Sequence, residues 1–351
     1  MLKCRQIILF ILISLAANAV YAGGIGTGGS DFLKILPGIR SAGMGGSGIA
    51  LGLDADSIWL NPAALYLKPE KKQFYYSHLD WWESVDYEYV AYVHGIDRIG
   101  VFGGSFSFLH MPEFELTNVY GIPTGEILSI YDIMLDLAYG GKIKNGLYWG
   151  INVKSIRRKL GDYDSHGYSS DLGFVYRIKL KRNSGDSIKY SYLNFAAVFQ
   201  NIMGTGIVFN DPDDRDNFPV VIKLGAAYRP ARNVSFAVDI DIPDDGGIKL
   251  HAGIEDWLSK KFCLRAGYDG MDDFYLPSGV CLGFSLNPNL RVDYNSNKAK
   301  KISKYFLTQI DYALRMTGDM GIVQRIALRM DFESGKKERK RSKKKVVSTS
   351  G

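Results

Sequence analysis

The sequence predicts an all-β protein, a 14-stranded antiparallel transmembrane β-barrel. Three observations predict this fold. From residue 72 onward, apolar and polar residues alternate with period 2, as in strands with one apolar and one polar face. The alternating segments number fourteen, an even count that single-chain bacterial barrels require. The connections alternate between long and short, as outer loops and periplasmic turns do in such barrels.

Residues 1–22 are predicted to form a cleaved secretory signal peptide. Lys3 and Arg5 precede an apolar run over residues 7–20, and a small-residue cleavage site ends at Ala22. The run is shorter than the roughly 20 residues that span a bilayer. The whole chain contains 22 tyrosines, 18 phenylalanines and 39 glycines. An exported, aromatic-rich chain without long apolar helices is typical of a barrel in the outer membrane of a diderm bacterium.

The predicted strands are illustrated by the segment near residue 232. Phe236, Val238 and Ile240 form one face, and Ser235 and Asp239 lie on the other. A water-soluble sandwich can alternate in the same way, with its apolar face in a core. The strand number, the strand length and the loop asymmetry favour the barrel, in which the apolar face contacts lipid. The fourteen segments start near residues 72, 86, 99, 130, 146, 168, 188, 219, 232, 247, 260, 277, 305 and 319.

The loop pattern assigns the two ends of the barrel. The predicted long outer loops are Met111–Ile127, Leu160–Gly167, Ile202–Phe218 and Gly270–Leu276. The predicted short periplasmic turns include Asp97-Arg98, Lys144-Asn145, Pro230-Ala231 and Ser259. The exception is Asn287–Lys304, a long connection that falls on the periplasmic side.

The polar, inward positions carry charges of both signs, which we expect to pair across neighbouring strands. They do not form a ring of one sign, as an ion-selective pore requires. The inward charges are Asp136, Lys154, Asp171, Lys223, Asp239, Lys249, Glu255, Arg265, Asp311, Arg315, Arg325 and Arg329.

The two cysteines of the mature chain, Cys263 and Cys281, fall on the inward parity of neighbouring strands. A turn centred near Asp272 would place them directly opposite each other, and an oxidising periplasm would then favour a cross-strand disulfide. The alternative is a pair of free thiols, because cross-strand disulfides are often strained.

No enzyme, metal or cofactor site is predicted. The five histidines are dispersed, and no G-x-S-x-G turn is present. Asp132 and Asp136 lie roughly 13 Å apart on one strand face, too far for a glycosidase pair. The glycine-rich run from Arg40 to Leu65 lacks the lysine and the parallel strand of a phosphate-binding loop. Its glycines instead suit a chain packed closely in a confined space.

Residues 31–65 resemble the N-terminal motif of the PorV/PorQ family of outer-membrane proteins, within the wider FadL-like group. The likeness continues in order to about Phe332; the basic tail and the connection before residue 304 depart from it. The matching elements are Phe32-Leu33-Lys34, Gly38, Arg40, Ala42-Gly43-Met44-Gly45-Gly46, Asp54-Ala55-Asp56 and Asn61-Pro62-Ala63.

The resemblance implies that residues 23–70 form a plug or hatch inside the lumen of a barrel formed by residues 71–333. A basic, solvated tail (334–351) follows; contact with anionic lipid is its alternative role. The charged hatch residues are expected to pair with lumenal charges. The candidate hatch or gate residues are Arg40, Gly43, Met44, Gly45, Gly46, Asp54, Asp56, Asn61, Pro62 and Ala63.

Two functions follow from the resemblance. PorV/PorQ proteins imply a non-enzymatic component of the type IX secretion machinery, which binds secreted cargo or a translocon subunit through the loops Met111–Ile127 and Ile202–Phe218. The FadL-like group implies passive uptake of hydrophobic small molecules such as long-chain fatty acids or aromatic hydrocarbons. A purely structural envelope barrel is the third alternative. Outer-membrane lipid surrounds the barrel in each case, and no nucleic acid is involved.

Overall fold

The computed structural model describes residues 31–334, with gaps at 53, 71, 82–83, 185–186, 209–214, 271–277, 289–303 and 319–320. The predicted signal peptide, the basic tail from residue 335 onward and most of the loops Gly270–Leu276 and Asn287–Lys304 lie outside the described residues. Among the described residues, none of the helices is long and apolar enough to cross a bilayer.

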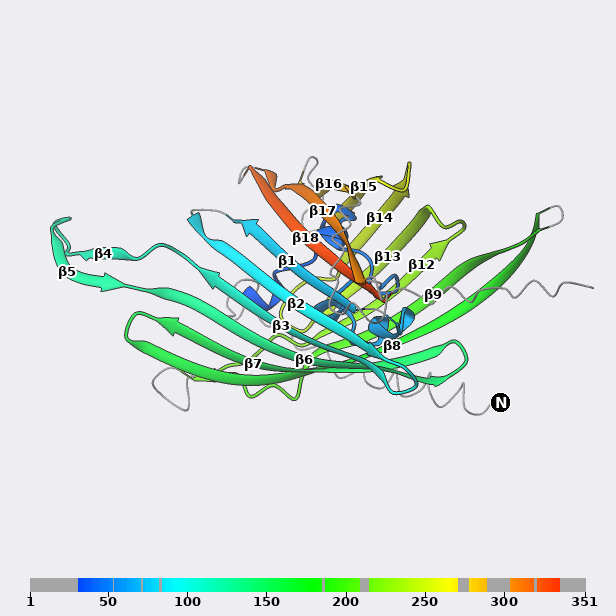
Figure 1. Cartoon of the computed structure of the whole chain (residues 1–351). Helices are drawn as coiled ribbons and strands as arrows, with labels where there is room; N and C mark the ends of the chain where they lie inside the picture. The colour runs from blue at the N-terminus through cyan, green and yellow to red at the C-terminus, as the bar shows by residue number, and fades with distance from the viewer. Residues whose placement is uncertain are drawn as a thin grey trace, which may run out of the picture.

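The fold is a closed antiparallel barrel of fourteen strands, which confirms the predicted fold class (Figure 1). The first and last strands close it, with Gln73 opposite Asp331 and Asp80 opposite Gln324. The strand order around the barrel is β1-β18-β17-β16-β15-β14-β13-β12-β9-β8-β7-β6-β3-β2. The strands are β1 (Lys72–Asp80), β2 (Asp86–Ile96), β3 (Gly100–His110), β6 (Ile130–Lys144), β7 (Leu147–Leu160), β8 (Tyr163–Ser184), β9 (Ser187–Ile202), β12 (Val221–Arg229), β13 (Val234–Pro243), β14 (Lys249–Trp257), β15 (Phe262–Asp269), β16 (Val280–Leu286), β17 (Lys304–Met316) and β18 (Ile322–Ser334).

The two faces of the strands follow the predicted alternation. Phe236, Val238 and Ile240 of β13 are exposed on the outside of the barrel, whereas Ser235 and Asp239, at the alternate positions, are buried. Because successive side chains of a strand point to opposite faces, the polar residues line the lumen. The inside of this barrel is therefore polar, and the outside carries the apolar residues.

Two of the long connections contain small hairpins of their own. β4 (Phe114–Thr117) pairs with β5 (Pro123–Leu128), and these strands extend well beyond the barrel in Figure 1. β10 (Ile207–Val208) pairs with β11 (Arg215–Asp216). We call the end of the barrel that carries these hairpins the long-loop end, and the opposite end the short-turn end.

The predicted long loop Leu160–Gly167 is wrong. β7 and β8 remain paired up to Leu160 and Tyr163, so that only residues 161 and 162 form the turn. Gly161 has a positive φ of 59°, a conformation that glycine adopts readily. Polar and small residues at successive positions suggested a loop, but the strand keeps two faces there: Ser165 is buried and donates to the carbonyl of Val208, whereas Asp164 and His166 are exposed.

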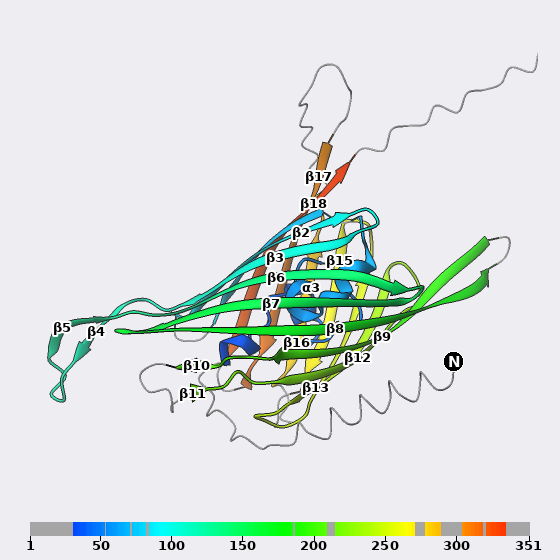
Figure 2. The ribbon, with the colours of Figure 1, turned by 90° about the horizontal axis from the view of Figure 1, so that it is seen from below.

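The N-terminal segment, residues 31–70, lies inside the barrel. It contains four short helices: η1 (Asp31–Lys34), α2 (Ile39–Gly43), α3 (Ser57–Leu60) and η2 (Pro62–Leu67). In Figure 2, α3 is seen within the ring of strands. Near its start, Lys34 forms an ion pair of 2.5 Å with Asp245, which follows β13 at the long-loop end. Near its end, the carbonyl of Leu67 accepts a hydrogen bond from Arg177, beside the turn between β6 and β7.

Candidate functional site

The lumen wall carries paired charges, as the sequence predicted. Lys154 and Asp171, on neighbouring strands β7 and β8, are both buried and lie 2.8 Å apart. Arg265 of β15 forms an ion pair of 2.9 Å with Glu255 of β14. Pairing of this kind avoids the large cost of burying an isolated charge.

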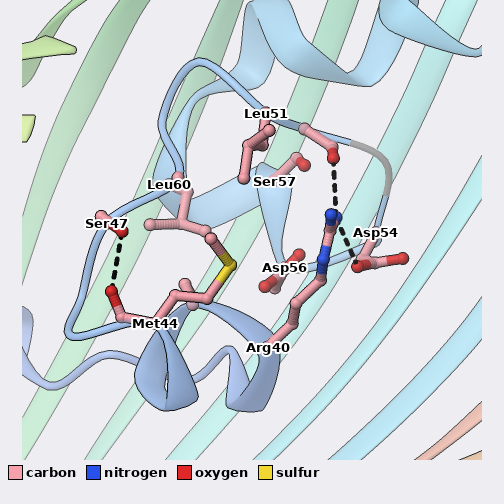
Figure 3. Close-up of a pocket in the computed structure, with 11 residues that line it drawn as sticks. Arg40, Met44, Ser47, Leu51, Asp54, Asp56, Ser57 and Leu60 are labelled. Atoms are coloured by element: carbon pink, nitrogen blue, oxygen red, sulfur yellow. Dashed lines mark hydrogen bonds and ion pairs between the residues drawn. The ribbon is translucent and has the colours of Figure 1, made fainter. Parts of the chain in front are cut away.

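Arg40 connects the N-terminal segment to this wall. Its Nε and Nη2 atoms each donate a hydrogen bond of 2.7 Å to the carboxylate of Glu255. Its Nη1 atom donates to the carbonyl of Gly52 at 3.0 Å and to Asp54 at 3.2 Å (Figure 3). Burial by itself would lower the pKa of the Arg40 guanidinium, but the carboxylates of Glu255 and Asp54 outweigh burial and raise that pKa. Arg40 therefore stays charged inside the barrel.

Asp54 connects the N-terminal segment to a second part of the barrel wall, strand β18. It accepts a hydrogen bond of 2.6 Å from Arg329 of β18 as well as the one from Arg40. The expected pairing of Arg40 and Asp54 with lumenal charges is therefore observed. Asp56 is also buried, and its carboxylate lies beside Gly38 within the segment.

Backbone groups of the segment also bond to the wall. The amides of Gly48 and Ile49 donate to one carboxylate oxygen of Asp239, at 2.6 and 3.0 Å. The carbonyl of Gly45 lies 3.0 Å from Nδ1 of His251, whose ring also faces Asp269. The sequence analysis treated the five histidines as dispersed and did not predict this contact. The inward position of His251 in the alternating pattern of β14 could have indicated that its ring faces the N-terminal segment.

A patch of three wall glycines receives the turn at Asn61-Pro62-Ala63. Gly140, Gly150 and Gly173 lie opposite one another on β6, β7 and β8. A Cβ atom added at Gly140 would lie 2.8 Å from the carbonyl oxygen of Pro62, and one added at Gly150 would lie 2.6 Å from the same atom. We call these three residues the glycine patch. Only glycine leaves room there for the backbone of the segment.

A second close approach lies on β14 and β15, where Gly253 and Gly267 face each other. A Cβ atom added at Gly253 would lie 2.6 Å from the Cβ atom of Met44. In the segment, Gly45 has a φ of +70° and its added Cβ would overlap the backbone of Tyr268. The sequence analysis assigned the close packing to the glycines of the segment and did not predict the glycines of the wall. Their inward positions on neighbouring strands could have indicated that they face the segment.

The predicted disulfide between Cys263 and Cys281 is wrong. Both side chains are buried and inward, but both are free thiols. The strand register places Cys263 opposite Ser285 and Cys281 opposite Gly267. The thiols are thus offset by four residues, about 13 Å along the strand. The predicted turn centre at Asp272 was two residues too early, a slip that leaves the face of every side chain unchanged.

Little space remains within the N-terminal segment. The cavity drawn in Figure 3, beside Arg40 and Met44, measures about 20 Å³, which is room for about one water molecule. A larger cavity of about 190 Å³ lies at the short-turn end of the lumen. Among the residues that the structure describes, no group of three or more His, Cys, Asp or Glu side chains could hold a metal ion.

Searches of protein-family models and of curated proteins find no match to the chain. Solved structures do match. The toluene transporter TbuX of Ralstonia pickettii is 12% identical, with a TM-score of 0.52 over 85% of this chain and 98% of that chain. The Pseudomonas putida toluene transporter TodX is 14% identical, with a TM-score of 0.45 over 90% and 98%. A Pseudomonas aeruginosa FadL homologue is 10% identical, with a TM-score of 0.42 over 83% and 96%.

At this level of identity, the likeness to TbuX establishes that the two chains share a fold over nearly the whole of TbuX. The narrower resemblance to PorV/PorQ proteins is not supported by these comparisons and stays a prediction.

Proposed function

We propose that the chain is an outer-membrane channel for small hydrophobic molecules, with the N-terminal segment as its hatch. The observation that carries the proposal is a closed barrel whose lumen is occupied by a segment of the same chain, in a fold shared with a toluene transporter. The proposal favours the uptake hypothesis over the secretion hypothesis.

The outer face of the barrel supports a position in a membrane. Large apolar side chains are exposed on many strands, and soluble monomers rarely expose apolar patches above a few hundred Å². In a bilayer the same side chains contact lipid tails. Examples are Phe102, Leu135, Leu137, Val153, Val238, Leu264 and Ile326.

The construction of the segment supports its role as a hatch. Its helices contain only four to six residues, so each depends on contacts with the wall for its stability. Those contacts are separate hydrogen bonds and ion pairs, each of modest net strength. A route through the lumen opens when the segment leaves the glycine patch, which makes the Asn61-Pro62-Ala63 turn the gate.

Uptake tests the proposal. The chain is expressed in diderm cells that lack their own channel for hydrophobic molecules, and the initial uptake of radiolabelled toluene and oleate is measured. We expect faster uptake of at least one probe than in cells with an empty vector, at equal amounts of folded barrel. Rates equal to the empty vector for both probes would overturn the proposal.

The β4–β5 hairpin favours a second function, docking of a partner protein. Val119 is 94% exposed and Tyr120 is 85% exposed at its tip, and Ile122 and Ile127 are exposed beside them. Together with the PorV/PorQ resemblance, this apolar tip suits a translocon subunit or secreted cargo. Replacing residues 117–123 by a short polar turn should abolish co-purification of such a partner while leaving toluene uptake unchanged. Unchanged co-purification would contradict docking through this hairpin.

A further inference from the structure

The cavity of about 190 Å³ at the short-turn end is lined by three cationic side chains, those of Lys68, Arg177 and Arg229. Tyr192, Asn194 and three apolar side chains complete the lining. Lys68 follows η2 of the N-terminal segment, and Arg177 and Arg229 belong to β8 and β12. Residues distant in the sequence therefore bring three positive charges to one cavity.

Neutral groups hold the two arginines in place. Nε of Arg177 donates to Asn194 at 3.2 Å, and its guanidinium lies 5.1 Å from the ring centre of Tyr192. Nε of Arg229 donates to the hydroxyl of Ser235 at 3.1 Å. Nη1 of Arg177 also donates to the carbonyl of Leu67 at 3.4 Å. Arginine has five N–H donors, so further donors remain for a ligand.

No carboxylate of the described residues forms an ion pair with these charges; Glu255 and Asp54 attract Arg229 from a distance, and both pair with other arginines. Within the described part of the chain, none of the ion pairs includes Lys68, Arg177 or Arg229, and the described lining contains neither Asp nor Glu. By contrast, Arg40, Arg265 and Arg329 pair with carboxylates. Like charges that share a partly buried cavity repel one another, so an anion in the cavity would be stabilised by all three.

We propose that this cavity binds a small oxyanion with two negative charges, such as phosphate or a phosphate monoester, from the short-turn side. The guanidinium fork matches phosphate oxygens in a bidentate geometry, and lysine adds a mobile point charge. Three cations suit a dianion better than a monocarboxylate. The volume suits a small anion, because cavities for larger organic ligands measure about 300–1,000 Å³. The proposal does not rest on the channel function proposed above.

Equilibrium binding to the full chain in detergent tests the site. Inorganic phosphate, phenyl phosphate and acetate are titrated at constant ionic strength into the wild type and into Arg229→Gln, Lys68→Gln and Arg232→Gln. Arg232 is the matched control, because it lies exposed in the turn directly after β12. A shift in gel migration on heating shows that each variant is a folded barrel. Lys68→Gln changes an exposed residue of the N-terminal segment and leaves the barrel strands unaltered.

We expect both phosphates to bind more tightly than acetate. Arg229→Gln should weaken phosphate binding by about tenfold or more, because it removes charge-assisted hydrogen bonds. Lys68→Gln should weaken it less, and Arg232→Gln should leave it unchanged. Absence of phosphate binding, equal binding of acetate, or equal affinities of Arg229→Gln and Arg232→Gln would each overturn the proposal. None of these results depends on uptake of hydrophobic molecules.

Discussion

Replacing Gly150 by alanine should release the gate turn from the wall without damaging the barrel. Gly150 is the middle residue of the glycine patch, with Gly140 and Gly173 on either side. A Cβ atom there would lie 2.6 Å from the carbonyl oxygen of Pro62, and closer still to the backbone of Ala63. Ordinary contacts between carbon atoms are about 3.5–4.0 Å, so the turn has to shift by about 1 Å.

The size of the effect follows from this overlap. Overpacking a close-packed site costs about 1–3 kcal/mol. The cost falls on the contact between the turn and the wall, so it should raise the population of the released turn by about 5- to 150-fold. Hydrogen exchange measured by mass spectrometry on the peptide that covers residues 58–66 reports this opening. We expect faster exchange there by that factor and unchanged exchange in the strands.

Gly104→Ala provides the control for this prediction. Gly104 lies in β3, and its added Cβ would meet only ordinary contacts of 3.7 Å, with no atom of the N-terminal segment among them. This variant should exchange like the wild type. If residues 58–66 exchanged as slowly in Gly150→Ala as in Gly104→Ala, the glycine patch would not hold the turn, and the reasoning from close approach would be refuted.

Two further predictions concern the contact between Asp239 and the N-terminal segment, and the two thiols. Asp239→Ala removes the acceptor for the amides of Gly48 and Ile49, and each unpaired buried donor costs about 1–3 kcal/mol. Hydrogen exchange in residues 44–52 should therefore rise at least tenfold. Asp97→Ala is the control and should have no effect, because Asp97 is exposed at a turn. Cys263 and Cys281 should both react with a maleimide when the protein is denatured without reductant. A mass spectrum that shows the two residues linked by a disulfide would contradict the strand register.

Much of the fold could be predicted because alternation is a local property of the sequence. The face of each residue follows from its parity, so Lys154, Asp171 and Asp239 were correctly placed inside. Strand β8 was predicted to start near residue 168, but it starts at Tyr163. At the start of β8 the outward residues Asp164 and His166 are polar, and the buried inward residues Ser165 and Gly167 are polar or small, so the apolar–polar alternation that marks a strand is lost there.

The site was harder to predict because it depends on register and on contacts between distant segments. Parity alone placed Cys263 and Cys281 inside, but only the register separates them along the strands. The glycine patch forms because three neighbouring strands place Gly140, Gly150 and Gly173 side by side. No single strand reveals that arrangement. The cationic cavity likewise combines residues from three strands, β8, β9 and β12, and the N-terminal segment.

The central claim is that the N-terminal segment has to move for passage through the barrel, and a reversible lock tests it most directly. Ile58 of α3 faces Gly103 of β3, where an added Cβ would lie 2.7 Å from Cγ1 of Ile58. A cysteine pair at these positions suits a disulfide, in a background with Cys263 and Cys281 replaced by serine. Oxidation should abolish toluene uptake and reduction should restore it, with Ile58→Cys alone as the control. Uptake by the oxidised pair at the rate of the reduced pair would contradict the claim.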